Sequence, residues 1–478
     1  MRDMIVIMNY SDEFSIEIAR RLRAEQVYAR IVPADADEAL IRSLSPRGVI
    51  LGGAAAGVGG TLNPAALTLG VPVLALGHAA HMLLAALGGA SADAAVREKK
   101  ARIEYGDSPL FAGLTGGERY LEEALTMMLP PDVRVIASAG GCTIAFESAQ
   151  KQHYGVQFEL ERNDPEGSAI LKNFVRDICG CGAWWTLDAA LAQAEGLLAE
   201  AAKAGGSALC AVSGGVDSTV AAVLAHRAFG ERMTAIFVDT GLMRDGEAAE
   251  VQATFEALGV PLLCVDRSGE VLEHLAHKRG GEEKRAVVTS VLQAEMIRQS
   301  ASRAGTTTLV LGTNYSDFLG CGSGAKGWDG LRVAEPLLEL FKEEVRAIAS
   351  RLGMEESIAA RKPFPALGLG ARIVGEITGE RLHALRMAER VFSEEIREAG
   401  LDRKLYKYFP ILVAGDGVMG GETMVLRAVT LSGSLLLPAR LPYDLVERTV
   451  QRIQAQSPSV ARVFYDQTPT QAGRESFT

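Results

Sequence analysis

The feature that most constrains this sequence is a small-residue turn, Ser213-Gly-Gly-Val-Asp-Ser218, directly after the apolar run at residues 208–212. The short apolar run predicts a buried strand, and the Ala-, Val- and Leu-rich stretch at 219–229 predicts a helix. Gly214 and Gly215 allow backbone conformations that point several N–H groups at one anion. The N-terminus of the following helix adds about half a positive elementary charge. The segment therefore predicts a strand–turn–helix unit that binds phosphate.

Asp217 is out of place in a pure phosphate site unless it holds a Mg²⁺ that bridges phosphates. The turn also lacks the Gly-x-x-x-x-Gly-Lys-Ser/Thr pattern of the Walker loop. An ordinary tight turn is the alternative interpretation. The string resembles the pyrophosphate loop of the ATP pyrophosphatases, which split ATP into AMP and pyrophosphate while adenylating a substrate. This resemblance implies that ATP and Mg²⁺ are bound by six residues: Ser213, Gly214, Gly215, Val216, Asp217 and Ser218.

The composition indicates an ordinary globular protein of two or three domains. The chain has 478 residues, of which 48% are hydrophobic and 23% charged. A formal net charge of -10 argues against nucleic acid as a partner. The apolar stretch at 62–87 is interrupted by prolines, glycines and histidines, which argues against a membrane span. Six cysteines without metal-like spacing, and no secretion signal, predict a cytoplasmic protein with free thiols.

Short apolar runs alternate with helical patterns along most of the chain, which predicts an α/β fold. Before residue 185 we expect strands near 4–8, 49–51, 71–76, 134–138 and 154–158. A helix at 187–203 leads into a second part, with strands near 209–212, 234–238, 262–265 and 308–311. A helix at 380–398 follows a Gly- and Pro-rich cluster. Domain boundaries are predicted near 185 and 375.

Further segments stand in a fixed order around the turn. They are residues 175–181 with Trp185 and Thr186, 237–244, 282–285, 312–317, 335–337, 340–346, 363–372, 417–420, 426–429 and 462–466. The ordered set resembles the glutamine-hydrolysing GMP synthases along nearly the whole chain. The resemblance implies a class I glutamine amidotransferase-like α/β domain at 1–185. An ATP pyrophosphatase domain with a parallel sheet is implied at 186–375, and a small α+β C-terminal domain at 376–478, which dimerises and completes the substrate site.

In that family, ammonia from glutamine displaces AMP from the adenylated C2 oxygen of XMP. This chain departs from the family at the glutaminase. The nucleophilic cysteine position is Gly77, and the family's histidine falls on Glu159; only the orienting Glu161 is retained. His78 and His81 lie beside Gly77 but have no obvious acidic partner in the sequence. We therefore expect no glutaminase activity, with ammonia supplied free or by a partner glutaminase.

The substrate end departs as well. Thr470 and Thr478 replace a lysine and a glutamate of the family, residues 421–423 lack a phosphate-binding arginine, and a glycine-rich segment at 320–330 replaces the family's lid. Lys326 and Arg474 are the cations that could compensate. The adenylated molecule is therefore expected to be a small, purine-nucleotide-like or related substrate, not XMP in particular.

Beyond the turn, the expected catalytic residues are Asp317 and Lys342 together with Asp217. Asp239 and Arg244 are expected to bind ATP, because they follow the next strand at its carboxyl end. The alternatives are a helix cap for Asp239 and a solvated helix lysine for Lys342.

Three functions remain open from the sequence. The first is adenylation followed by ammonia transfer, in a homodimer as in the family. The second is adenylation followed by sulfur transfer, with Cys321 of the glycine-rich segment as the thiol. The third is a non-catalytic nucleotide-binding paralogue.

Overall fold

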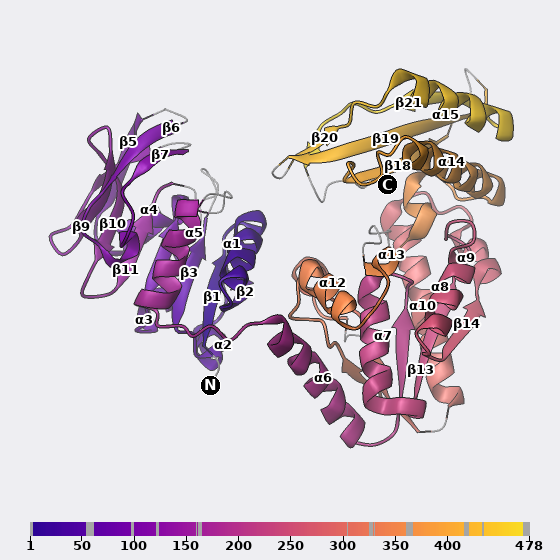
Figure 1. Ribbon diagram of the computed structural model, residues 1–478, viewed down its shortest axis with the longest axis horizontal. Helices are drawn as coiled ribbons and strands as arrows, with labels where there is room; N and C mark the ends of the chain where they lie inside the picture. Colours follow the sequence, from indigo (N-terminus) through magenta and orange to yellow (C-terminus); the bar gives the residue numbers. More distant parts are fainter. Residues whose placement is uncertain are drawn as a thin grey trace. The chain divides into compact units, whose positions relative to one another are not determined.

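The structure is a computed structural model of the chain. It describes residues 3–53, 62–96, 100–120, 124–158, 160, 165–303, 305–324, 328, 330–359, 367–414, 420–432 and 435–471. The chain divides into two compact units, Met1–Ala189 and Ala190–Thr478 (Figure 1). Both are α/β. No helix in the described ranges is long and apolar enough to cross a membrane.

The first unit is built on a nine-stranded sheet of order β2-β1-β3-β4-β11-β10-β9-β6-β7. The strands from β2 to β11 are parallel, and those beyond are antiparallel. The central strands are wholly buried, as expected where helices cover both faces of a parallel sheet. The strands are β1 Met4–Asn9, β2 Tyr28–Pro33, β3 Gly48–Gly52, β4 Val73–Leu76, β6 Lys100–Tyr105, β7 Gly117–Tyr120, β9 Arg134–Ala139, β10 Cys142–Ser148 and β11 His153–Val156, with β5 Ala90–Val96 and β8 Ala124–Met128 as a separate pair. The helices are α1 Asp12–Ala24, α2 Glu38–Leu44, α3 Ala65–Thr68, α4 His78–Ala86 and α5 Pro165–Lys172, with the 3-10 helix η1 Pro109–Phe111 and the π-helix η2 Asn173–Ile178.

The second unit begins with a five-stranded parallel sheet of order β14-β13-β12-β15-β16. Because β12 lies between β13 and β15, the chain leaves it first toward one edge and later toward the other. The carboxyl end of the paired strands β12 and β15 is thus a topological switch point, where open α/β sheets bind ligands. The strands are β12 Ser207–Val212, β13 Met233–Asp239, β14 Leu262–Asp266, β15 Thr306–Val310 and β16 Arg332–Ala334. The helices are α6 Leu187–Lys203, α7 Val216–Phe229, α8 Glu247–Ala257, α9 Ser268–Leu275, α10 Gly281–Ser302, α11 Tyr315–Cys321, α12 Lys342–Arg351 and α13 Glu356–Ala359, with η3 Gly230–Arg232.

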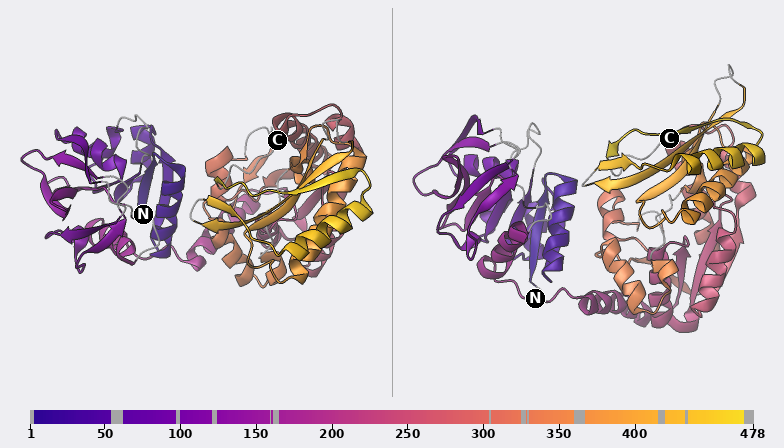
Figure 2. Two further views of the ribbon diagram at one scale, coloured as in Figure 1. Left: turned by 90° about the horizontal axis from the view of Figure 1, so that it is seen from above. Right: turned by 45° about the horizontal axis from the view of Figure 1, so that its top comes forward.

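A third sheet completes the second unit. It has the order β17-β18-β19-β20-β22, and β21 pairs with the other half of the long strand β19. Helices α14 and α15 pack together along one face (Figures 1 and 2). The elements are η4 Gly368–Arg372, β17 Ile373–Val374, α14 Gly379–Glu398, β18 Lys407–Val413, β19 Glu422–Ser432, β20 Leu435–Pro438, α15 Tyr443–Gln456, β21 Val460–Tyr465 and β22 Thr470–Gln471.

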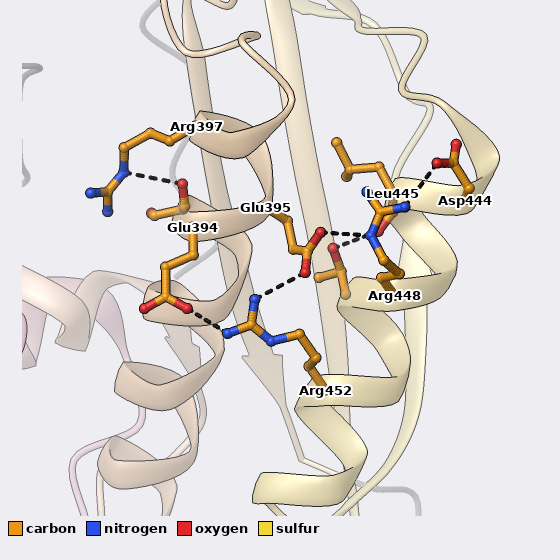
Figure 3. A network of polar contacts seen from close by, with 9 residues as sticks. Glu394, Glu395, Arg397, Asp444, Leu445, Arg448 and Arg452 are labelled. Carbon is orange, nitrogen blue, oxygen red and sulfur yellow. Dashed lines mark hydrogen bonds and ion pairs between the residues drawn. The ribbon is translucent and has the colours of Figure 1, made fainter.

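Ion pairs join α14 to α15 at the solvent edge of their apolar interface (Figure 3). Glu395 accepts hydrogen bonds from Arg448 at 3.1 Å and Arg452 at 2.9 Å, and Arg452 also pairs with Glu394. Burial raises the pKa of Glu395, but hydrogen bonds from Arg452 and Arg448 outweigh it, so the pKa lies below its usual value. The carboxylate therefore stays charged and keeps the two helices in one register.

The turn after β13 is packed against the beginning of the third-sheet region. Leu242 is completely buried in the core beneath α14, and its carbonyl accepts a 2.7 Å hydrogen bond from the Leu369 N–H. Gly368 has a φ of +59°, and a Cβ built there would collide with the Leu242 carbonyl oxygen. The close approach and the positive φ both require glycine at 368.

Replacing Gly368 with alanine should therefore lower the free energy of unfolding of the second unit by about 2–4 kcal/mol, from φ strain and overpacking together. Gly353→Ala is the matched control: its φ is +80° and an added Cβ meets nothing within 4 Å, so only the strain of about 1–2 kcal/mol remains. Denaturant unfolding of both variants measures the difference. Equal losses would show that the Leu242 contact adjusts without cost.

Candidate functional site

The predicted phosphate turn joins β12 to α7 and is closed by its own serine hydroxyls. The Ser218 hydroxyl accepts from the Ser213 N–H at 3.1 Å and donates to the Gly215 carbonyl at 3.1 Å. Gly214 has a φ of +79°, which a side chain would strain. The helix begins at Val216, three residues earlier than the sequence pattern indicates. Val216, Asp217 and Ser218 thus lie in its first turn, where backbone N–H groups face outward.

Asp217 forms an ion pair with Lys342, the first residue of α12. The Lys342 Nζ lies 3.1 Å from Asp217 Oδ2, although 125 positions separate the two residues. The other oxygen, Oδ1, is buried and has no hydrogen-bond partner within the described part of the chain. A carboxylate oxygen left in this state costs free energy unless a donor or a cation meets it. The arrangement fits a Mg²⁺ held by one carboxylate and by ligand phosphates.

Asp317 lies close enough to this pair to feel both charges. It sits in the first turn of α11, where its N–H donates to Asn314 Oδ1 at 3.0 Å and its carboxylate accepts from the Asn314 N–H at 3.3 Å. Burial raises the pKa of Asp317, and the negative charge of Asp217 raises it further. The hydrogen bond from the Asn314 N–H and the positive charge of Lys342 lower the pKa, but the net shift is upward. One carboxylate oxygen is thus used as a helix cap.

Gly312 explains how α7 and the segment after β15 come so close. A Cβ at this position would lie 2.7 Å from the Cα and the N of Ser218. Only a residue without a side chain allows this approach. The structure therefore brings Asp217, Asp317 and Lys342 together at the switch point between β12 and β15.

The other two predicted residues lie at the neighbouring strand. Asp239 ends β13, and its Oδ1 accepts a 2.8 Å hydrogen bond from the Gly241 N–H, so it closes the turn after the strand. The Arg244 guanidinium does not join the Asp217 cluster; its Nε donates to Glu389 Oε1 on α14 at 3.0 Å. Sequence reasoning missed Glu389 and Arg386, which contact this turn from 143 to 145 positions away. No local signal marks them, because arginines and glutamates are common on exposed helix faces.

In the first unit, Gly77 forms a sharp turn between β4 and α4. Its φ of 58° and ψ of −128° are disfavoured for residues with a side chain. Its N–H donates to the Val156 carbonyl at 2.8 Å, and a Cβ built there meets nothing within 4 Å. The strand-to-helix elbow is therefore formed with room for a side chain but without one. Glu159 and Glu161 lie outside the described residues.

His78 and His81 follow the elbow, with ring centroids 5.9 Å apart. His81 Nδ1 lies 2.8 Å from the Ser91 hydroxyl. Burial, and to a smaller extent the charge of His78, lower the pKa of His81 to about 4 against the opposing effect of a hydrogen bond with the Gln157 side chain. A ring with this pKa is a weak base at neutral pH, and the described partners that orient it are not acidic.

This chain is similar to one protein-family model over part of its length and to known proteins over nearly all of it. The NAD synthase family model matches residues 196–374. A glutamine-hydrolysing GMP synthase of Geobacillus kaustophilus is 36% identical over 499 residues, covering 98% of each chain. The GMP synthase of Thermomicrobium roseum is 35% identical and covers 98% of this chain and 95% of its own length. The GMP synthase of Symbiobacterium thermophilum is 36% identical, and the match covers 99% of this chain and 98% of its own length.

The pKa of His81 makes the stability of the first unit depend on pH. Between pH 4 and 6.5 the unfolded state binds more protons than the folded state, so stability should fall as the pH falls and level off below 4. His81→Gln should remove up to about 3 kcal/mol of this dependence. The measurement is denaturant unfolding at several pH values, followed by Trp184 and Trp185 fluorescence in a Trp328→Phe background. An unchanged pH dependence in the variant would contradict the burial of a neutral ring.

Proposed function

This chain belongs to the family of the glutamine-hydrolysing GMP synthases and is an ATP-dependent C–N ligase, and we propose that it works without a glutaminase of its own. In this proposal ATP adenylates a carbonyl oxygen of a small, purine-nucleotide-like substrate, and ammonia then displaces AMP. The observation that carries the proposal is the Asp217 carboxylate at the switch point, with Lys342 on one oxygen and the other oxygen unpartnered among the described residues.

The phosphate turn supplies the groups that bind the departing pyrophosphate. N–H groups of the turn and of the first turn of α7 would donate to the anion, and the Ser213 hydroxyl could turn toward it, while the Ser218 hydroxyl holds the turn in shape through the Gly215 carbonyl. Asp217 would hold Mg²⁺, which supplies charge neutralisation when bound. Lys342 lies where it can balance the charge that develops on the leaving group as the substrate oxygen attacks the α-phosphorus.

Asp317, in the first turn of α11, and Asp239, at the end of β13, are the other two carboxylates of the proposed site. We assign Asp317 a positioning role, because it caps α11 close to Asp217. Asp239 is assigned to the edge of the nucleoside position, since β13 ends beside the phosphate turn.

The absence of a glutaminase is proposed from the elbow. Glycine at 77 has no nucleophilic atom, and loss of the nucleophile from such a unit typically costs about 10⁴–10⁶ in rate. The weakly basic His81 does not replace the missing group. Ammonia would therefore come from solution or from a partner glutaminase.

A homodimer through the third sheet is part of the proposal. Leu431, Leu435, Leu437 and Phe464 expose apolar side chains on this sheet. These side chains come from three neighbouring strands, β19, β20 and β21, and exposed apolar side chains of this size favour association. A second copy of the chain is the partner that the family resemblance implies.

The two alternatives have less support. Sulfur transfer depends on Cys321, whose side chain lies outside the described residues. A binding-only role would also place a cation at the buried carboxylate oxygen, but the ligase family to which the chain belongs favours turnover over binding alone.

Pyrophosphate release with ATP, Mg²⁺ and ammonium should be observed for at least one substrate in a panel of purine nucleotides and related oxo-heterocycles. Asp217→Asn and Lys342→Met should each lower kcat/KM by about 10²–10³, because each removes a charge that acts on the transferring phosphate. Lys203→Met is the control, since Lys203 is a surface lysine in an exposed pair with Glu200. Full activity in Asp217→Asn, or no turnover with any substrate, would contradict the proposal and favour the binding role.

Glutamine should not replace ammonium in the same assay, and glutamate should not be released. Gly77→Ala should leave the ammonium-dependent rate unchanged, because no reacting atom is removed. Glutamate release by the wild-type protein would show that the first unit is a working glutaminase. Activity that requires a sulfide donor in place of ammonium, and is lost in Cys321→Ser, would favour the sulfur-transfer alternative.

A further inference from the structure

The turn after β13, residues 240–246, is held by side chains of α14. Arg386 donates from Nε to the Met243 carbonyl at 2.8 Å and from Nη2 to the Gly241 carbonyl. The carbonyl between them, on Leu242, accepts from the Leu369 N–H. Three consecutive carbonyls of the turn are thus bound by residues more than 120 positions away in sequence.

Glu389, one helical turn after Arg386, fixes the end of the same segment. Its Oε1 accepts from Arg244 Nε at 3.0 Å, and its Oε2 accepts from Arg372 Nη1 at 2.9 Å. Glu389 is 4% exposed and Arg372 is 8% exposed, so the pair is shielded from water. The Arg372 guanidinium also lies 4.7 Å from the centre of the Phe409 ring. A shielded carboxylate between two arginines has little freedom to change partners.

The position of this turn gives the contacts a consequence for the ligand site. Phe237 of β13 is paired with Val212 of β12, so the last two residues of β13 run beside the beginning of the phosphate turn. Asp239 then leads directly into the segment that Arg386 and Glu389 hold. Residues 240–246 therefore border the carboxyl edge of the sheet where ATP is placed by the proposed function.

We propose that Arg386 and Glu389 are positioning residues for ATP, which hold the 240–246 turn in the one shape that receives the nucleoside part. The proposal rests on the proposed function for the identity of the ligand. Without Arg386 the turn samples several conformations. The apparent affinity for ATP is then the intrinsic affinity multiplied by the fraction of molecules in which the turn is correctly formed. Chemistry at saturating ATP is little changed, because neither side chain reaches the phosphate turn.

The test compares Arg386→Met with Arg397→Met in the full-length protein. Arg397 lies on the same helix, is exposed, and donates to the Ser393 carbonyl of its own helix (Figure 3). Equilibrium binding of a non-hydrolysable ATP analogue with Mg²⁺ gives the Kd, and steady-state pyrophosphate release gives KM for ATP and kcat. Amide hydrogen exchange of residues 240–246 reports the turn itself. Arg386→Lys and Glu389→Gln are milder variants for use if Arg386→Met does not fold.

Arg386→Met should bind the analogue about 10-fold more weakly and raise KM for ATP similarly, with kcat within about 2-fold. Exchange at 240–246 should quicken, and Arg397→Met should match the wild type in every measurement. A folded Arg386→Met, or milder variant, with unchanged Kd would overturn the proposal and leave a purely structural contact. If the wild type binds no ATP analogue, the proposed function and the positioning role of Arg386 and Glu389 both fail. If it binds the analogue but turns over no substrate, only the proposed reaction fails, and the comparison of Kd values still tests the positioning role.

Discussion

One charged contact marks the place where the elements of the second unit converge, the pair between Asp217 on α7 and Lys342 on α12. Burying a carboxylate with one oxygen unpartnered within the described chain is unfavourable by itself. The fold tolerates it because three elements converge there: the first turn of α7, the start of α12, and the segment after β15, which passes Ser218 at a distance that only Gly312 permits. The strand order creates this convergence, since the segments that follow β12 and β15 both begin at the carboxyl end of these two paired strands. The topology therefore supports the proposed ATP site at this place as much as the turn does.

The local residue pattern predicts most elements near this site. It does not predict elements whose position is set by contacts with residues distant in the sequence. The helix at 187–203 was predicted with the bounds that α6 has, and the strand before the phosphate turn was predicted within two residues. Apolar periodicity placed the start of α7 at 219 instead of 216, because that start is set by the Ser218 hydroxyl on the Gly215 carbonyl. The strand β2 at Tyr28–Pro33 was not predicted; it contains Arg30 and is defined by its parallel pairing with β1. The strands of the third sheet carry mixed apolar and polar side chains and were not predicted individually.

The residues of the candidate site also differ in whether neighbouring residues in the sequence could reveal them. The turn from Ser213 to Ser218 could be read from six residues, whereas Asp317 and Lys342 came from resemblance to a family, and the structure places both near Asp217. Arg244 was expected at ATP and is paired with Glu389. Its contact could not be foreseen, because the partner lies 145 positions away on an amphipathic helix. Arg386 binds backbone carbonyls, which every residue type carries, so no residue pattern could indicate its target.

In the first unit, the backbone conformation at Gly77 bears on why the fold would be kept if glutaminase activity is lost, as proposed. In a working elbow, a side chain at φ 58° and ψ −128° adds strain of about 1–3 kcal/mol, which the surrounding sheet and helix must offset. Glycine adopts the same angles without that strain. Under the proposed loss of glutaminase, Gly77 provides no nucleophile and relaxes the turn, while its N–H donates to the Val156 carbonyl and keeps α4 in place. We propose that the unit keeps its fold because this loss carries no stability penalty. Loss of Lys342, by contrast, would leave the Asp217 carboxylate, whose side chain is 15% exposed, without its counter-charge.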